Sequence, residues 1–192
     1  MAISRNHKGH ALLALVTILS LAAVCSAQTV TESSSNTTIK IKNFGQMDDR
    51  FYRGAQPKEQ DYKALAQLGI KTIIDLREDP EEYSKSAVEA VGMTYVNIPM
   101  IAKKYPTAEA TATFLKTVND PATGKFFVHC AGGRHRTGAM GAVYRFNFYN
   151  WNFDQVYKEM KKFDFYTSWG HGAFKDFVKD YAQKHQTQAT EN

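Results

Sequence analysis

Residues Phe126–Met140 read FFVHCAGGRHRTGAM, an apolar run that stops at a cysteine and continues as a loop of glycines and bases. A run of Phe and Val of this length is typical of a buried strand, and the small residues after the loop begin a helical pattern. Cys130 therefore stands where a strand ends, and Thr137 where a helix begins. Gly132 and Gly133 permit positive φ angles, which let successive backbone N–H groups turn toward one anion.

The segments around this stretch predict an α/β fold. Strands are expected within 51–57 and at 70–76, 93–98 and 125–129, and helices at 57–69, 79–92, 107–120, 137–150, 152–163 and 172–185. The alternation of strands and helices implies a mostly parallel central sheet flanked by helices. The last three segments are all helical and form a helical C-terminal part. We expect this domain to span 39–186 and a polar tail to follow at 187–192.

Two helix starts are predicted from local signals. Pro57 is expected to open the first helix, with Tyr62, Leu65 and Leu68 on its buried face, because proline suits the first helical turn. The helix at 79–92 is expected to carry its acidic residues in the first turn, where the helix dipole favours them.

The N-terminal segment 1–27 has the pattern of a secretory signal peptide. A basic start precedes the apolar stretch Ala11–Val24, and small residues lead up to an expected cleavage after Ala27. The stretch is shorter than the ~18–20 residues of a membrane span. The prediction is an exported protein, secreted or periplasmic, with no stable membrane insertion after cleavage; a retained anchor and lipidation at Cys25 are the alternatives. Residues 28–38 are expected to form a flexible linker.

Charge and cysteine content narrow the possible partners. The chain has a formal net charge of +5, which falls to about +3 once the leader with Arg5 and Lys8 is removed. This mildly basic charge fits an anionic ligand, and the chain has no dense run of Lys and Arg of the kind that suggests nucleic acid. Removal of the leader leaves Cys130 without a disulfide partner, although exported proteins ordinarily use cysteines in pairs. A buried thiol, a metal ligand and a nucleophile then remain as roles for Cys130.

The context of Cys130 favours the nucleophile. In a parallel sheet, ligands bind at the carboxyl ends of the strands. A helix N-terminus attracts anions, and Arg136 offers a planar fork that suits two phosphate oxygens. The same features lower the pKa of a cysteine from ~8.5 to ~3.5–7.5. One geometry would therefore bind a phosphate dianion and ionise the thiol beneath it.

The spacing from His129 and Cys130 through five residues to Arg136 and Thr137 resembles H-C-x5-R-[ST], the signature of the cysteine-dependent protein tyrosine phosphatase superfamily. The βα units that precede the motif point to the dual-specificity branch. "GRHRTG", "FYRGAQP" and "GIKTIIDLRED" resemble the atypical plant and fungal dual-specificity phosphatases, some of which cleave inositol pyrophosphates.

This resemblance implies roles for the motif residues. Cys130 would attack phosphorus to form a phosphocysteine, Arg136 would grip the phosphoryl oxygens, Thr137 would hydrogen-bond the sulfur, and His129 would order the loop from behind. The substrate-binding phosphate loop would consist of Ala131, Gly132, Gly133, Arg134, His135 and Arg136. No cofactor or metal is implied. The implied partner is a phosphorylated substrate, either a phosphoprotein or an inositol phosphate-like polyanion.

The general acid of this family is not evident in the sequence. Residues 92–108, where an aspartate is expected, contain no Asp or Glu. Asp79 is the remaining candidate, because its loop also ends at the carboxyl edge of the sheet. Otherwise the enzyme would prefer leaving groups that need little protonation, and Lys103 and Lys104 would favour a polyanionic substrate.

Alternatives to a phosphatase stay open at this point. The missing acid motivates a catalytically weak phosphoanion-binding module, and a loop cysteine on an α/β sheet also occurs in rhodanese-like sulfurtransferases. A zinc site from His129, Cys130 and His135 lacks a fourth donor. Arg134 and His135 either contact the substrate or stay solvated.

Five further residues are expected to be structural. Asp75 and Arg77 would fix a strand end by local hydrogen bonds, and Tyr52 and Arg53 would pack against the phosphate loop. His171 is expected to cap a helix or lie at the surface.

Overall fold

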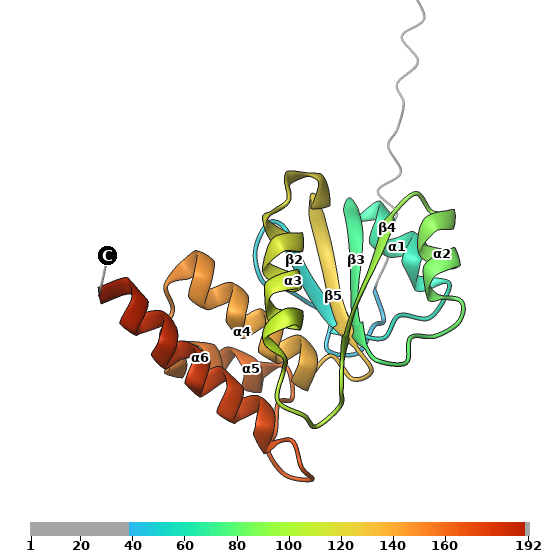
Figure 1. The fold of residues 1–192 in the computed structure, drawn as a ribbon. Coiled ribbons are helices and arrows are strands. Elements are labelled where there is room, and N and C mark those ends of the chain that lie inside the picture. Colours follow the sequence, from blue (N-terminus) through green and yellow to red (C-terminus); the bar gives the residue numbers. More distant parts are fainter. Residues whose placement is uncertain (1–38, 191–192) are drawn as a thin grey trace, which may run out of the picture. The chain divides into compact units, whose positions relative to one another are not determined.

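The computed structural model describes residues 39–190 (Figure 1). The expected leader and linker, 1–27 and 28–38, lie outside these residues. The strands are β1 (Gly45–Gln46), β2 (Phe51–Ala55), β3 (Ile70–Arg77), β4 (Thr94–Met100) and β5 (Lys125–Cys130). The helices are α1 (Asp61–Gln67), α2 (Ser84–Ala90), α3 (Ala108–Asn119), the short 3-10 helix η1 (Pro121–Thr123), α4 (His135–Tyr149), α5 (Phe153–Lys162) and α6 (Gly172–Thr190).

The strands form one sheet in the order β1-β2-β5-β3-β4. Only the β1–β2 pair is antiparallel, and the three other pairs are parallel. This confirms the predicted mostly parallel α/β fold. The parallel arrangement also explains the sequence of β5, because a central strand with helices on both faces must be apolar on both.

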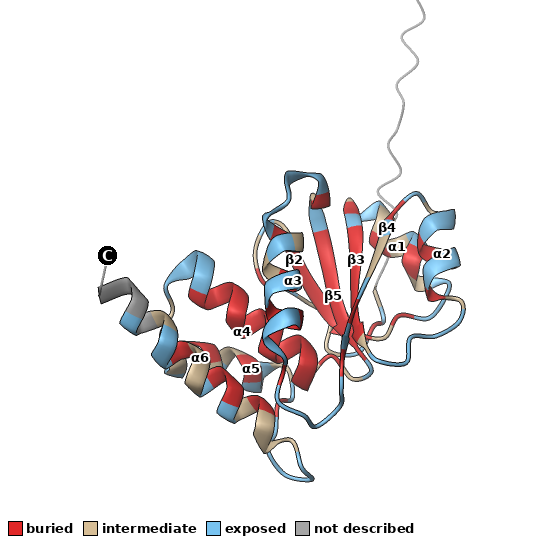
Figure 2. Ribbon diagram, in the orientation of Figure 1, coloured by how far each residue is buried: buried red, intermediate tan, exposed pale blue. Residues whose placement is uncertain are grey.

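Two apolar clusters lie on opposite faces of the sheet. On one face, Phe126 and Val128 of β5 pack against α3, α4, α5 and α6. On the other face, Phe127 of the same strand packs against α1 and α2. Successive side chains of a strand point to opposite faces, so this single strand supplies both clusters. Figure 2 shows the result: buried strands at the centre, and a buried α4 beside them.

The first helix begins later than predicted. The α1 helix starts at Asp61, because the carboxylate of Asp61 accepts the N–H of Lys58 at 2.9 Å and closes a turn that occupies the residues after Pro57. Tyr62 is buried as expected, but Leu68 lies beyond the helix and is 38% exposed.

The second helix also begins later, at Ser84, and it has no acidic residue in its first turn. Asp79 and Glu81 lie in the preceding loop instead, where both pair with the guanidinium of Arg77. The prediction that these acids belong to the helix was therefore wrong, because a charge partner on the neighbouring strand end holds them in the loop.

Strand register places the motif at the carboxyl edge of the sheet. Cys130 ends β5 opposite Ala55 at the end of β2, and His129 lies opposite Asp75 of β3. The chain then turns through residues 131–134 into α4. No helix in the described residues 39–190 has the length and apolar character needed to cross a membrane.

Candidate active site

The loop from Ala131 to Arg134 is held from its outer side. Three consecutive carbonyl oxygens accept hydrogen bonds from residues elsewhere in the chain. These bonds are Gln56 N–H to the Ala131 oxygen (3.3 Å), Asn43 Nδ2 to the Gly132 oxygen (2.8 Å) and Arg53 Nη2 to the Gly133 oxygen (2.7 Å). In a trans peptide the N–H points opposite to the carbonyl. The amides that follow these carbonyls therefore turn inward and form an anion-binding concavity.

Gly133 is required by this loop. Its φ is +66°, in the left-handed region. A Cβ on Gly133 would lie against the backbone of Gly54 and 2.5 Å from the Ala55 nitrogen. Only glycine lets the loop approach the end of β2 this closely.

The Cys130 thiol is buried at the base of the loop. Burial opposes its ionisation, but hydrogen bonding from Thr137, the charge of Arg136 and the Gly133 N–H outweigh burial and lower the pKa of Cys130. Among the described residues, the Thr137 hydroxyl has no hydrogen-bond partner other than this sulfur. The hydroxyl can therefore donate to the Cys130 sulfur without giving up another contact.

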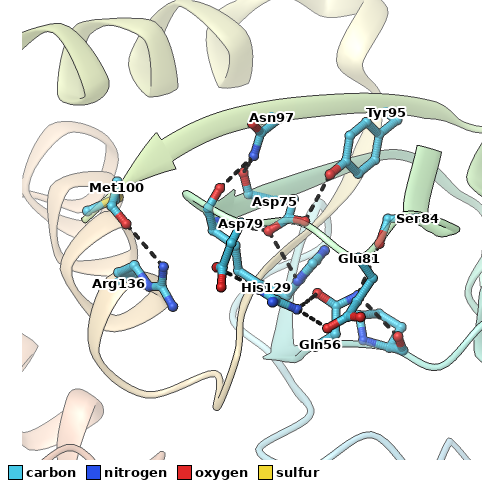
Figure 3. Close-up of polar contacts among 12 residues, drawn as sticks. Gln56, Asp75, Asp79, Glu81, Ser84, Tyr95, Asn97, Met100, His129 and Arg136 are labelled. Atoms are coloured by element: carbon cyan, nitrogen blue, oxygen red, sulfur yellow. Dashed lines mark hydrogen bonds and ion pairs between the residues drawn. The ribbon is translucent and has the colours of Figure 1, made fainter. Parts of the chain in front are cut away.

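Arg136 lies in the first turn of α4, and its position is fixed. Its Nη1 donates to the Met100 carbonyl oxygen at 3.0 Å, at the end of β4 (Figure 3). The side chain is buried, and its remaining N–H groups are available to a ligand. One anchored nitrogen keeps the planar fork in a single orientation, as bidentate recognition of phosphate requires.

A cavity of about 260 Å³ opens above Cys130. Its lining residues are Ala102, Lys103, Cys130, Ala131, Gly132, Arg134, His135, Arg136, Tyr166, His171 and Phe174. Three of them are cations and none is an acid. Lys103 is thus placed at the site, whereas Lys104, its neighbour in sequence, does not line the cavity.

One wall of the cavity is an aromatic cluster built on His135. Its Nε2 lies 3.0 Å from the Tyr166 carbonyl oxygen. A carbonyl only accepts, so Nε2 carries the proton. The His171 ring stacks on the His135 ring with centroids 3.7 Å apart and planes within 7°. Burial, with a smaller effect from His171, lowers the pKa of His135 to about 4.

His171 is therefore not placed as the sequence suggested. It precedes α6 in the chain, but its ring belongs to the cavity wall. No local pattern marks this position, because the contact depends on how the α5–α6 segment folds back over the phosphate loop. Tyr166 and Phe174 also line the cavity. The sequence did not predict their place there, because it depends on the same path of the chain.

Arg134 lies at the cavity edge and is partly exposed. Its guanidinium pairs with the Asp164 carboxylate at 3.6 Å and lies 5.8 Å from the centre of the Tyr166 ring. Both contacts come from the segment between α5 and α6. Arg134 therefore joins this segment to the phosphate loop while it contributes positive charge to the cavity.

His129 lies behind the loop and does not line the cavity. It is fully buried, and its Nδ1 is 3.7 Å from Asp75 Oδ1 (Figure 3). Burial lowers the pKa of His129 to about 4, against the opposing effect of Asp75. The Asp75 carboxylate also accepts the Arg77 N–H at 2.9 Å and the Tyr95 hydroxyl at 2.9 Å. Asp75 and Arg77 thus fix the end of β3.

Asp79 lies outside the cavity. Its side chain is 76% exposed, and one oxygen is 3.4 Å from Arg77 Nε. The hydrogen bond and charge of Arg77 lower the pKa of Asp79. A lowered pKa keeps the carboxylate ionised, whereas a general acid must carry a proton. These observations disfavour Asp79 as the proton donor.

The structure also disfavours a zinc site formed by His129, Cys130 and His135. His129 faces Asp75, and His135 donates to the Tyr166 carbonyl. Across residues 39–190 there is no group of three or more His, Cys, Asp or Glu side chains that could hold a metal ion.

Cys130 and Arg136 have the spacing of the phosphatase signature, and a loop of inward-facing amides joins them at the edge of a parallel sheet. These features define a cysteine-based phosphatase. A family model supports this class directly. The model described as "DSP-PTPase phosphatase fused to NAD+ Kinase" matches residues 20–176, and the chain belongs to that family.

Individual relatives agree with the family. The probable tyrosine-protein phosphatase DG1060 of Dictyostelium discoideum is 29% identical over 126 residues, covering 63% of this chain and 75% of the relative. The inositol diphosphatase SIW14 of Saccharomyces cerevisiae is 27% identical over 135 residues, covering 66% and 47%. The crystal structure of the SIW14 core catalytic domain with citrate has the same fold, with a TM-score of 0.64 at 22% identity over 79% of this chain and 93% of that one.

Proposed function

We propose that this chain is an exported phosphatase that hydrolyses phosphate monoesters through a phosphocysteine intermediate. The observation that supports it best is the lowered pKa of the Cys130 thiol at the base of the loop. The carbonyls of Ala131, Gly132 and Gly133 are hydrogen-bonded on the outer side of that loop, so its amides face the thiol.

The first step transfers the phosphoryl group to sulfur. The Cys130 thiolate attacks phosphorus, an S–P bond forms, and the P–O bond to the leaving group breaks. Arg136 and the loop amides hold the three non-bridging oxygens, where charge develops in the transition state. The leaving oxygen keeps the electron pair of the broken bond.

The second step releases phosphate. A water attacks phosphorus, the S–P bond breaks, and sulfur leaves as a thiolate. The Thr137 hydroxyl, which has no other regular hydrogen bond within the described residues, donates to the departing sulfur and favours this step. The attacking water releases one proton to solvent and the leaving oxygen of the first step takes one up from solvent, so the products are the alcohol, inorganic phosphate and the starting enzyme.

Charge around the cavity supports a polyanionic substrate of the inositol phosphate class. Lys103, Arg134 and Arg136 line the cavity, and no acidic side chain does so in the described part of the chain. The similarity to an inositol diphosphatase points the same way, and the similarity to a tyrosine-protein phosphatase keeps phosphoproteins as the second class. Without an acid, leaving groups that need little protonation, such as aryl phosphates or pyrophosphates, would react fastest.

A phosphate-release assay over four substrate types tests this proposal: aryl phosphates, alkyl phosphates, phosphopeptides and inositol polyphosphates. Cys130→Ser should abolish release on all of them while substrate binding survives, because serine lacks a thiolate and the loop remains intact. Unchanged release in Cys130→Ser would refute the proposal.

The second candidate is a phosphoanion-binding module with negligible turnover, which the absence of an acid among the cavity-lining residues favours. A rapid burst of p-nitrophenol, equal to one per enzyme, would show phosphocysteine formation and exclude this candidate. Sulfur transfer from thiosulfate to cyanide would instead identify a rhodanese-like activity.

Export is the part of the proposal that rests on the sequence of residues 1–27. N-terminal sequencing of the protein recovered outside the cytoplasm should begin at Gln28. A protein recovered only in the cytoplasm with an intact N-terminus would refute export without affecting the phosphatase proposal.

A further inference from the structure

Arg53 is one of the largest fully buried side chains among the described residues. It lies in the middle of β2 with 1% of its surface exposed. In the parallel register, Arg53 is opposite Val128, which precedes Cys130 by two residues on β5. An arginine with this little exposure is unusual, because burying a charge is unfavourable unless it is paired and hydrogen-bonded.

The guanidinium of Arg53 is fixed beneath the phosphate loop. Its Nη2 donates to the Gly133 carbonyl oxygen at 2.7 Å. Its central carbon lies 4.0 Å from the centre of the Phe163 ring, which gives a cation–π contact. A Cβ on Gly141 of α4 would lie 3.6 Å from Nη1, so the side chain runs between β2 and α4.

The charge of Arg53 has no carboxylate partner among residues 39–190. Arg145, another buried arginine, contrasts with it. Arg145 donates to both oxygens of Glu159, at 2.7 and 3.1 Å. Arg53 has no such pair, and its Nε has no hydrogen-bond acceptor in the described structure.

The negative charges that act on Arg53 are those of Cys130 on β5 and Glu159 on α5. Burial lowers the pKa of Arg53 to about 10, and these two charges oppose that effect. Glu159 is already paired with Arg145. The thiolate is therefore the one of these two anions that has no salt bridge to another arginine in the described residues, and Arg53 stays protonated at neutral pH.

We propose that Arg53 is a positioning residue of the active site, which holds the Gly133 carbonyl outward and stabilises the Cys130 thiolate from behind the phosphate loop. Electrostatic coupling is mutual, so the Arg53 cation adds to the stabilisation of the thiolate, beside the larger effects of Thr137, Arg136 and the Gly133 N–H. Arg136 and Thr137 act on the same sulfur from α4. The inference deepens the proposed phosphatase function and rests on it.

Three variants separate charge from hydrogen bonding. Arg53→Gln removes the charge and keeps a donor for the Gly133 carbonyl, whereas Arg53→Lys keeps both. Arg50→Met is the matched control, because Arg50 precedes the other end of β2 and donates to the Gly124 and Val118 carbonyls, away from the site. The readout is the rate of Cys130 alkylation by iodoacetamide from pH 4.5 to 9, with kcat/KM for p-nitrophenyl phosphate measured alongside.

Arg53→Gln is expected to raise the Cys130 pKa by about one unit. At pH below the thiol pKa of both proteins, alkylation should then be about tenfold slower in the variant. Below both pKa values its kcat/KM should also fall by about tenfold, because less thiolate is present. Arg53→Lys should keep the thiol pKa within about half a unit of wild type, and Arg50→Met should leave it unchanged. A folded Arg53→Gln protein with the wild-type thiol pKa would overturn the proposal.

A second measurement uses the wild-type protein and does not depend on a variant that folds. The guanidinium ¹⁵N resonances of Arg53 should shift with pH along the Cys130 titration and lose this step in Cys130→Ser. Absence of the step in wild type would also overturn the proposal. Neither readout requires phosphate release, so a failure of the proposed function itself remains distinguishable.

Discussion

His135 donates its Nε2–H to the Tyr166 carbonyl oxygen at 3.0 Å, and this bond joins the phosphate loop to a segment 31 residues further along the chain. The His171 ring, from the end of that segment, stacks on the His135 ring. The cavity wall is therefore assembled from the loop itself and from the segment between α5 and α6. The stability of that segment should depend on a side chain of the predicted phosphate loop.

Replacing His135 with Phe should loosen this wall. Phenylalanine preserves ring stacking but removes the donor, so we expect a loss of about 1 kcal/mol of unfolding free energy, typical of one hydrogen bond. Amide hydrogen exchange should become faster at residues 164–171 and remain unchanged in β3. His185→Phe is the control, because the half-buried His185 ring on α6 packs near Phe146 and Tyr181 and does not line the cavity. Equal protection of 164–171 in wild type and His135→Phe would contradict this prediction.

Gly133→Ala and Gly132→Ala form a matched pair. At Gly133 the added methyl would meet the backbone of Gly54 and Ala55 at a positive φ, so we expect a destabilisation of about 2–4 kcal/mol from strain and overpacking. At Gly132 nothing outside its neighbours lies closer than 3.8 Å. Gly132→Ala should stay within about 1 kcal/mol of wild type.

Urea unfolding measures both changes, and kcat/KM for p-nitrophenyl phosphate shows whether the loop still works. Gly133→Ala should lose most activity even at temperatures where it is folded, because the Gly133 carbonyl can no longer reach Arg53. Similar losses in the two variants would mean that the approach of Gly133 to β2 is not needed.

Asp79→Asn should have little effect on catalysis. The Asp79 carboxylate is exposed, paired with Arg77 and held ionised by its lowered pKa, so it has no proton to give at neutral pH. We expect kcat/KM for aryl and alkyl phosphates to change by less than about threefold, against the ~10²–10⁴-fold typical of a general acid. A large loss confined to alkyl phosphates would instead assign Asp79 as the acid.

The sheet and the Cys130–Thr137 motif were predicted well because each is encoded in residues that lie next to one another in the sequence. The parallel sheet followed from alternating strand and helix patterns, and Cys130 through Thr137 form one uninterrupted motif between a strand and a helix. Their placement depends on local structure and on a general rule of parallel sheets.

The parts that escaped prediction are long-range. Asn43 is 89 residues from the Gly132 carbonyl that it holds, and Arg53 is 80 residues from Gly133. Packing of Arg53 against the loop was expected, but no sequence pattern reveals that it lacks a carboxylate partner. The cavity wall depends on the path of the segment between α5 and α6. The two misplaced helix starts are the local exception, because Asp61 and Arg77 bond to residues two to four positions away.

The two most perturbed histidines predict how stability changes with pH. Burial lowers the pKa of His129 and of His135 to about 4 in the folded protein, while unfolded histidine titrates near ~6.5. Between these values the unfolded chain binds more protons than the folded one, so acidification favours unfolding. The effect begins as the pH falls below about 6.5 and stops growing below about 4.

For His129, which is fully buried, the expected loss of unfolding free energy between pH 7.5 and pH 5 is about 2 kcal/mol, at a limiting slope of about 1.4 kcal/mol per pH unit. Urea titrations at pH 7.5, 6.5, 5.5 and 5.0 measure it. His129→Gln removes the titrating group. The slope of its unfolding free energy against pH should therefore be shallower than that of wild type, by up to about 1.4 kcal/mol per pH unit. Identical slopes in wild type and His129→Gln would mean that His129 binds as many protons in the folded state as in the unfolded state, and would contradict this prediction.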